Sequence, residues 1–342
     1  MVMIHGGDIY RNQVELDFSV NINPLGMSAG VRKALTEAVD ECMCYPDPWA
    51  EQLKRAVAGM LSVREESLLL GNGASELFLA VVCGLRPQRT VIPVPSFYGY
   101  EYAAAAGSGE ICYYPLKQEN HFGVEEGLLS CLDEETDLLF LANPNNPVGN
   151  LIPSYLLEKI LCHCREKGIC VVLDECFIEF CREVPSMVSR IEEYDNLILI
   201  RSFTKTFAIP GVRLGYLVCS NRKLLSSIKR QLPEWNLSVF AQRAGTACVR
   251  EYAMLEEMRK TVQREREFLE RGLKEAGFLV FPAEADFILI HTQIPLGKRL
   301  CEKGILIRDC SNFRGLSEGY FRIAVKTREE NLKLLQAIGE LI

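Results

Sequence analysis

The sequence predicts an α/β protein, with a large domain in which a mostly parallel sheet lies between helices and a smaller α+β domain. Between residues 68 and 218, short apolar runs typical of buried strands alternate with helical stretches. After residue 221 the chain changes to charged helical segments and shorter, separated strands. At 342 residues the chain is also longer than one small core requires. We expect an N-terminal arm with part of the small domain over 1–45, the large domain over 46–240, and the C-terminal small domain over 241–342.

Composition excludes several classes of partner. The formal net charge is −7, from 38 basic and 45 acidic residues, so neither nucleic acid nor an anionic membrane surface is expected as the main partner. No apolar run approaches the length that spans a bilayer. The first eight residues lack the basic and apolar regions of a secretory signal, and we expect a cytoplasmic protein.

The cysteines predict neither disulfides nor a metal site. There are fourteen of them but no Cys-x-x-Cys, and the chain has only four histidines. Several lie in apolar, strand-like runs, where a thiol packs as a small hydrophobic group. We therefore expect reduced, mostly buried thiols and no metal.

The N-terminal region contains two features that suit a ligand site. His5-Gly6-Gly7 combines an imidazole that can donate to an anion with glycines that permit close backbone approach, although a frayed terminus is an equally simple reading. Asn23-Pro24 belongs to a loop that continues to Gly26. Helices are then expected over 28–42, with Ser28 as N-cap, and over 49–61.

The central region predicts the sheet. Strands are expected at 68–70, 90–95, 138–142, 169–173, 197–200 and 214–218, with helices after Gly73, after Ser96 and over 153–167. The tail predicts an amphipathic helix at 224–229 and one long helical stretch from 239 to about 276, which is expected to bend where it leaves the first domain. Strands are expected at 278–281, 287–291, 305–308 and 321–325, and a last helix begins with the capping box of Thr327 and Glu330.

Polar side chains gather where the predicted strands end, which is where parallel sheets bind ligands. Lys205 follows one strand, between hydroxyl groups and an arginine that suit a phosphate, and its position suggests an amine kept for imine chemistry. A carboxylate, an amide and a small-residue helix start follow other strands. Pyridoxal phosphate needs such a combination. The set is Gly73, Ala74, Ser75, Phe97, Asn146, Asp174, Ser202, Thr204, Lys205 and Arg213.

In these motifs the chain resembles the fold-type I pyridoxal-phosphate enzymes of the class I/II aminotransferase group. Asn143–Gly149 is similar to that family's Asn-Pro-Asn-Asn-Pro-Thr-Gly loop, with Val148 in place of threonine. The resemblance implies that Asn146 binds the ring's phenolic oxygen, that Asp174 binds its pyridine nitrogen and that Lys205 forms the imine. It also implies that the Phe97 ring stacks on the cofactor ring, and that Tyr45 reaches the cofactor site of the partner subunit in a homodimer. The residues that it implies for the phosphate cradle are Gly73, Ala74, Ser75, Ser202, Thr204 and Arg213.

Two branches of this family compete. Histidinol-phosphate aminotransferases usually carry Asp-Glu-Ala-Tyr where this chain has Asp174-Glu175-Cys176-Phe177. The threonine-phosphate decarboxylases of cobalamin biosynthesis resemble it more closely, in the His-Gly-Gly start and in the segments 17–26, 174–180, 208–216 and 305–316. This closer resemblance implies decarboxylation of O-phospho-L-threonine to (R)-1-amino-2-propanol phosphate.

The same resemblance implies a set of substrate contacts. Arg322 matches the arginine that binds the α-carboxylate, Asn146 is also expected to contact the substrate, and the candidates for the substrate phosphate are Arg308, His5 and Asn23. The alternatives are a histidinol-phosphate or related amino-acid aminotransferase and, more remotely, a non-catalytic regulator that binds the cofactor. Such regulators usually carry a DNA-binding module ahead of this fold, whereas here the family pattern begins by residue 5 and the chain is acidic.

Overall fold

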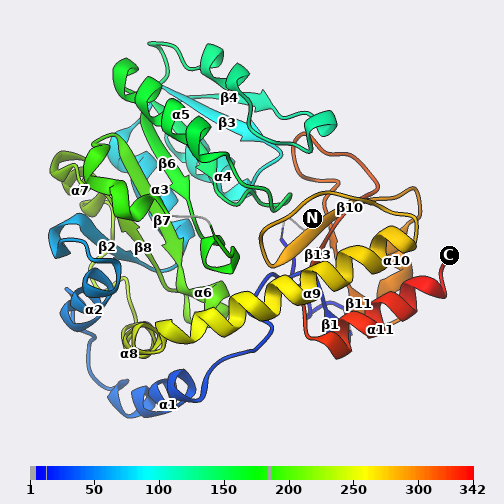
Figure 1. Ribbon diagram of the computed structural model, residues 1–342. Coiled ribbons are helices and arrows are strands. Elements are labelled where there is room, and N and C mark those ends of the chain that lie inside the picture. The colour runs from blue at the N-terminus through cyan, green and yellow to red at the C-terminus, as the bar shows by residue number, and fades with distance from the viewer. Residues whose placement is uncertain (1–4, 13, 184–185) are drawn as a thin grey trace.

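A seven-stranded sheet forms the centre of the computed structural model, which describes residues 5–12, 14–183 and 186–342. The strands lie in the order β2-β8-β7-β6-β5-β3-β4 (Figure 1). Their bounds are β2 (Leu68–Gly71), β3 (Arg89–Val94), β4 (Glu110–Pro115), β5 (Leu138–Ala142), β6 (Cys170–Asp174), β7 (Leu197–Ser202) and β8 (Gly215–Val218). From β4 to β7 all pairs are parallel, whereas β8 runs antiparallel to both β7 and β2. The mostly parallel sheet is confirmed, and β4 was not predicted.

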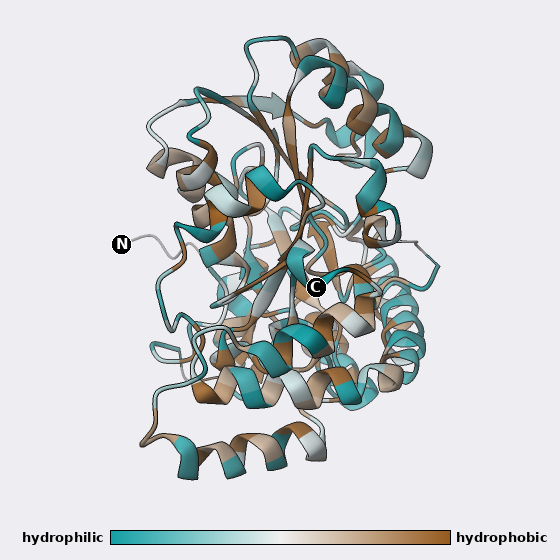
Figure 2. Ribbon diagram, turned by 90° about the vertical axis from the view of Figure 1, so that its left-hand side faces the viewer, coloured by the Kyte–Doolittle hydropathy of each residue, from teal (hydrophilic) through white to brown (hydrophobic). Residues whose placement is uncertain are grey.

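Apolar strands explain why this sheet lies inside. Every residue of β2, β7 and β8 is buried, and Figure 2 shows apolar strands surrounded by more hydrophilic helices. Such a sheet needs cover on both faces. The helices are α2 (Glu51–Leu61), α3 (Ala74–Leu85), α4 (Tyr98–Ala106), α5 (Ser154–Lys167) and α7 (Arg222–Lys229), and α3 packs against both α4 and α7.

The helical stretch expected from 239 to about 276, with a bend, is not one continuous helix, because the structure divides it into two. Helix α8 (Val239–Arg250) and helix α9 (Leu255–Glu275) are separated by a short 3-10 turn at Tyr252–Met254. The break coincides with a tertiary contact, since the Ser28 hydroxyl, at the start of α1 (Ala29–Glu37), donates to the Glu251 carboxylate. Helix α1 packs along α8 at the lower edge of the molecule in Figure 1. Helical periodicity in the sequence continued through this contact and gave no sign of it.

The C-terminal part contains a four-stranded antiparallel sheet in the order β12-β13-β10-β9. Its strands are β9 (Leu279–Val280), β10 (Phe287–His291), β12 (Arg308–Asp309) and β13 (Tyr320–Ala324), and the helices beside it are α10 (Leu296–Cys301) and α11 (Arg328–Gly339). The predicted capping box of Thr327 and Glu330 is confirmed.

One predicted strand in this part proves to be two. Residues 305–308 were expected to form a single strand, but β11 (Ile305–Leu306) pairs in parallel with β1 (Leu16–Asp17), while β12 pairs with β13. The N-terminal segment therefore lies against the C-terminal part, with Phe18 in the same apolar cluster as Ile305 and Ile323. The domain boundaries at 45 and 240 stay a prediction. Within the described residues, no helix is both long enough and apolar enough to cross a membrane.

Candidate active site

The loop that carries Lys205 leaves the sheet at the end of β7. The Ser202 hydroxyl accepts from the Thr204 amide and so caps the single turn α6 (Phe203–Thr206). Lys205 is only partly buried, and its Nζ lies 5.1 Å from the centre of the Phe177 ring. The N-terminal arm holds this turn, because Asn23 donates from its backbone to the Lys205 carbonyl and from its side chain to the Thr206 carbonyl, each over 2.9 Å.

Residues from three segments form a cradle for an anion beside this lysine. Sheet register places the ends of β2 and β7 on either side of the start of β8, since Gly215 pairs with Gly71 and with Ser202. The Ser202 and Thr204 hydroxyls lie 2.6 Å apart. Gly73 has φ of +79°, and a Cβ there would lie 2.5 Å from Nη2 of Arg213, so the guanidinium rests against the start of α3.

The chemistry of this cradle suits a phosphate. Ala74 and Ser75 begin α3, whose first amides have no partner within the helix and carry the positive end of its dipole. The guanidinium and the two hydroxyls add further donors. The six predicted cradle residues are thus brought together: Gly73, Ala74, Ser75, Ser202, Thr204 and Arg213.

Asp174 ends β6 and accepts two hydrogen bonds. Tyr100 Oη donates to its Oδ2 over 2.6 Å and the Cys176 amide to its Oδ1 over 2.8 Å. Tyr100 is buried between rings, stacked on Phe140 at 5.2 Å and edge-on to Phe97 at 5.7 Å. Burial, together with the Asp174 charge, raises the pKa of Tyr100, so its hydroxyl stays a donor. Tyr100 was not predicted as a site residue, because in the sequence it is one more residue of an alanine-rich helix.

Arg322 joins three parts of the chain in the interior. It lies on β13, and its Nη1 donates to Asn146 Oδ1 in the loop after β5. Its Nη2 donates to the Ser19 carbonyl of the N-terminal arm over 2.9 Å. With the Asn21 amide oxygen turned toward it, Asn21 accepts from Nε at 3.2 Å as well. The predicted pair of Asn146 and Arg322 is therefore in direct contact, and Asn21 was not predicted.

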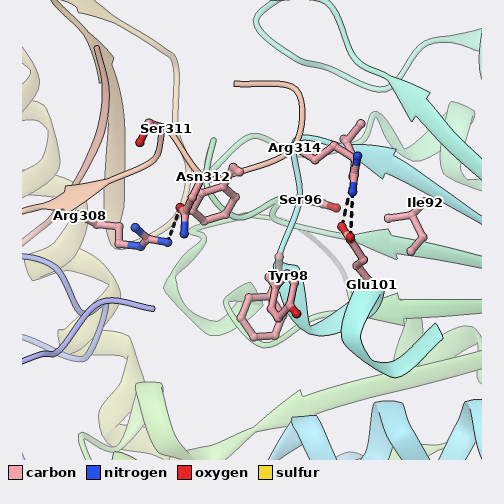
Figure 3. A pocket seen from close by; sticks show the side chains of 11 residues that line it. Ile92, Ser96, Tyr98, Glu101, Arg308, Ser311, Asn312 and Arg314 are labelled. Atoms are coloured by element: carbon pink, nitrogen blue, oxygen red, sulfur yellow. Dashed lines mark hydrogen bonds and ion pairs between the residues drawn. The ribbon is translucent and has the colours of Figure 1, made fainter. Parts of the chain in front are cut away.

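Three basic side chains of this site, those of His5, Arg308 and Arg322, lie close enough to influence one another's pKa. His5 lies 5.9 Å from the Phe97 ring, between centroids, and burial followed by the charges of Arg308 and Arg322 lowers its pKa. Burial also lowers the pKa of Arg308, and it lowers that of Arg322 to about 10, with the charge of Arg308 acting in the same direction. Arg308 and Phe97 line a pocket of about 340 Å³ (Figure 3). The sequence-predicted His5, Arg308 and Arg322 thus affect one another electrostatically.

Two predicted residues have other contacts. The side-chain amide of Asn23 donates to the Thr206 carbonyl, and its oxygen accepts from the Leu25 amide. Asn23 is therefore bonded to the turn that carries Lys205. Tyr45 is 84% exposed and lies 5.1 Å from the ring of Trp235. Their predicted roles, toward the substrate phosphate and toward a partner subunit, stay predictions.

Asp286 is a further buried group that the sequence did not single out. It precedes β10, is fully buried, and neither carboxylate oxygen has a hydrogen-bond partner among the described residues. Burial raises its pKa to about 7, against the opposing charges of Arg322 and Lys205. A carboxyl group with that pKa is mostly protonated below pH 7 and mostly ionised above it.

The thiols are free and less uniformly buried than expected. All fourteen cysteines are unpaired, but only six are buried, while five are intermediate and three are exposed. The expectation of mostly buried thiols is therefore wrong, because Cys42 and Cys44 lie in a surface turn and Cys131 ends a short 3-10 helix at the surface. In the described part of the chain, no three potential metal ligands among His, Cys, Asp and Glu come together.

Comparison with known proteins finds relatives over nearly the whole chain. The family model described as aminotransferase class I and II matches residues 13–338. The threonine-phosphate decarboxylase of Salmonella typhimurium is 34% identical, over 99% of this chain and 96% of its own length. The structure of the histidinol-phosphate aminotransferase from Clostridium acetobutylicum has a TM-score of 0.89 and 31% identity, over 95% of this chain and 98% of that one. The structure of L-threonine-O-3-phosphate decarboxylase from Porphyromonas gingivalis has a TM-score of 0.85 and 27% identity, over the same shares. The chain belongs to the class I and II aminotransferase family.

Proposed function

We propose that this protein is a pyridoxal-phosphate-dependent decarboxylase that converts O-phospho-L-threonine to (R)-1-amino-2-propanol phosphate in cobalamin biosynthesis. The identity to a threonine-phosphate decarboxylase over nearly the whole chain supports this function. The observation that carries it is the convergence of two buried arginines, Arg308 and Arg322, with His5.

The residues of the site fit the cofactor. The glycine at position 73 leaves room for Arg213 at the start of α3, and the cradle there would hold the cofactor phosphate. Lys205 would bind the cofactor covalently, Asp174 would bind its pyridine nitrogen, Asn146 its phenolic oxygen, and Phe97 would lie against its ring. When bound, pyridoxal phosphate supplies an electron-withdrawing ring for the electron pair of the bond that breaks at Cα. Tyr100 and the Cys176 amide hold the Asp174 carboxylate in place for this contact.

Electrostatics favours a substrate with two anionic groups. Arg322 and Arg308 disfavour each other's charge and that of His5, and this repulsion is relieved when anions bind between them. An amino acid that carries a phosphate ester supplies a carboxylate for Arg322 and a phosphate for Arg308, with His5 gaining a proton as the phosphate approaches. Histidinol phosphate carries its phosphate on the alcohol that replaces the carboxylate and has no second anionic group, so it leaves one arginine without an anion.

Placement of the substrate decides which bond breaks. Arg322 fixes the carboxylate, and contacts to the phosphate at the other end set the tilt of the bonds at Cα. Phe177, the aromatic ring next to Lys205 Nζ, carries no hydroxyl to donate to the cofactor, unlike the tyrosine usual in the aminotransferase branch. Lys205 would return a proton to Cα after carbon dioxide leaves.

We further propose that the protein is a cytoplasmic homodimer. Tyr45 and Trp49 are large apolar residues left 84% and 68% exposed, close to the exposed Trp235, and a second copy would cover such a patch. In that dimer Tyr45 would reach the cofactor phosphate of the partner subunit. Fourteen free thiols suit a reducing compartment.

One assay separates the candidate functions. Purified protein is given O-phospho-L-threonine, and carbon dioxide release is compared with 2-oxoglutarate-dependent transamination of histidinol phosphate. We expect decarboxylation. Transamination without decarboxylation would assign the protein to the aminotransferase branch, and cofactor binding with neither reaction would support the regulator.

In the same assay Arg308→Gln should raise KM for phosphothreonine at least about tenfold, since it removes a charged partner of the phosphate. Arg314→Gln, in the same pocket, is the matched control and should change this KM little.

Subunit mixing tests the dimer. A heterodimer of Lys205→Ala and Tyr45→Ala chains has one intact site only if Tyr45 acts across the interface. Both parent variants should be weakly active, while an equal mixture after exchange should recover about a quarter of wild-type activity, because half of the dimers are mixed and each restores one site. No recovery on mixing, with heterodimers verified, would place Tyr45 in its own subunit's site or in none.

A further inference from the structure

The pocket at the mouth of the site has two arginines at opposite ends. Figure 3 shows Arg308 at one end, beside Asn312, and Arg314 at the other, beside Glu101 on α4. Arg308 Nη2 donates to the uncharged Asn312 amide oxygen over 2.8 Å. Both arginines line the same pocket. A substrate phosphate bound beside Arg308 would nevertheless lie at a different distance from the substrate's own Cα than a phosphate bound beside Arg314.

Arg314 is held by a two-point ion pair. Its Nη2 donates to Glu101 Oε1 over 2.9 Å and its Nε to Oε2 over 3.2 Å. The guanidinium also lies 4.0 Å from the centre of the Tyr113 ring, so one face is stacked while its edge is paired. Hydrogen bonds from Arg314 and Tyr113 lower the pKa of Glu101, which therefore presents a full negative charge to the pocket at neutral pH.

This pair is poorly placed to contribute stability. The side chains of Glu101 and Arg314 are 28% and 50% exposed, and ion pairs with that exposure contribute little to folding. Their position in the pocket wall suggests a role toward the ligand instead. Paired with a carboxylate, Arg314 offers an approaching phosphate no net positive charge, and the carboxylate itself repels the phosphate.

We propose that Glu101 is a specificity-determining residue, which neutralises Arg314 and so confines the substrate phosphate to the Arg308 end of the pocket. The inference rests on the proposed function, and it adds a limit on the substrate class: amino acids whose phosphorus is separated from Cα by two atoms, as in phosphothreonine. Substrates with a longer spacing would carry their phosphate toward the Glu101 carboxylate and be rejected.

A ligand series tests this limit without depending on turnover. Amino acids that carry a terminal phosphonate, with two, three or four methylene groups between Cα and phosphorus, are titrated calorimetrically into the cofactor-loaded protein. The wild type should bind the two-methylene ligand best, with affinity falling at each added methylene. The Glu101→Gln variant should bind the three- and four-methylene ligands at least about tenfold more tightly than the wild type does. Its affinity for the two-methylene ligand should change little, because only the longer ligands approach the position of the removed charge.

Two further variants separate charge from structure. The double variant Glu101→Gln/Arg314→Gln should lose the gain, since no cation remains at that end, and Arg314→Gln alone should bind the longer ligands more weakly than the wild type. An equal change for all three ligands in Glu101→Gln, or no change for the longer ones, would overturn the inference and leave the pair a surface contact. If phosphothreonine is not decarboxylated but the length preference and its reversal are observed, the proposed reaction fails while the specificity role of Glu101 stands.

Discussion

Asp286→Asn should change how the stability of this protein depends on pH. The carboxyl group is fully buried beside the site, and neither of its oxygens has a hydrogen-bond partner among the described residues. Burial raises its pKa from 3.8 to about 7, although Arg322, Lys205 and Lys326 are near enough to oppose the rise. An amide of the same shape has no charge to bury, so the substitution removes this titration and little else.

The sign follows from proton counting. Between pH 4 and 7 the unfolded chain releases the Asp286 proton while the folded chain keeps it, so the folded state loses stability as pH rises. The contribution is fully present below the unfolded pKa of 3.8 and has been lost once pH passes the folded value near 7. A shift of this size corresponds to about 4 kcal/mol in total, of which about 3 kcal/mol is lost between pH 5 and pH 8.

Urea unfolding of wild type and variant at pH 5, 6, 7 and 8 measures this difference. The stability advantage of Asp286→Asn should grow by about 3 kcal/mol from pH 5 to pH 8, most of it below pH 7. Asp40→Asn, at an exposed aspartate, is the matched control and should show no such trend. If the difference in unfolding free energy between Asp286→Asn and the wild type stays constant from pH 5 to pH 8, the conclusion that Asp286 is protonated in the folded protein at low pH and has a raised pKa is refuted.

Three further changes test the cofactor site. Lys205→Ala should abolish the visible absorbance of the lysine-bound cofactor, and a surviving band would mean that another residue binds it. Gly73→Ala should weaken pyridoxal phosphate binding about tenfold or more in a fluorescence titration, since the new Cβ would lie 2.5 Å from Arg213 in a backbone conformation with φ of +79°; an unchanged affinity would remove Arg213 from the cradle. Tyr100→Phe leaves a buried oxygen of Asp174 without its donor, at a cost of about 1–3 kcal/mol, and should lower kcat while leaving KM for phosphothreonine nearly unchanged; wild-type kcat would count against Tyr100 as a positioning residue.

Six of the seven strands of the sheet were predictable because each is a short apolar run followed by polar residues. The strand ending at Asp174 and the strand leading to Lys205 were predicted within two residues of β6 and β7. The missed β4 is an edge strand that begins at Glu110 and ends at Pro115, and its residues are mostly half-buried rather than apolar throughout. An edge strand of that kind lacks the signal of a core strand, since only one side of it pairs.

Contacts between distant segments were less accessible to sequence reasoning. Tyr100 reaches Asp174 across 74 residues and the Glu251–Ser28 bond spans 223, and neither leaves a periodic pattern. Asp286 is missed for a related reason, because the sequence does not reveal whether a buried carboxyl group has a partner. Arg322 and Asn146 were found through a motif, and their direct contact could only come from the fold.

The N-terminal arm links two groups on which the proposed reaction depends, Lys205 and Arg322. Within a few residues, Asn23 holds the carbonyls of Lys205 and Thr206, while the carbonyl of Ser19 receives a hydrogen bond from Arg322. One short segment therefore sets the position of the lysine relative to the arginine proposed to hold the carboxylate. Because the proposed reaction depends on how the bonds at Cα are placed, changes in the arm would alter the choice of reaction without altering either group. Two branches of the family can then share the lysine, the aspartate and the arginine and still differ in chemistry.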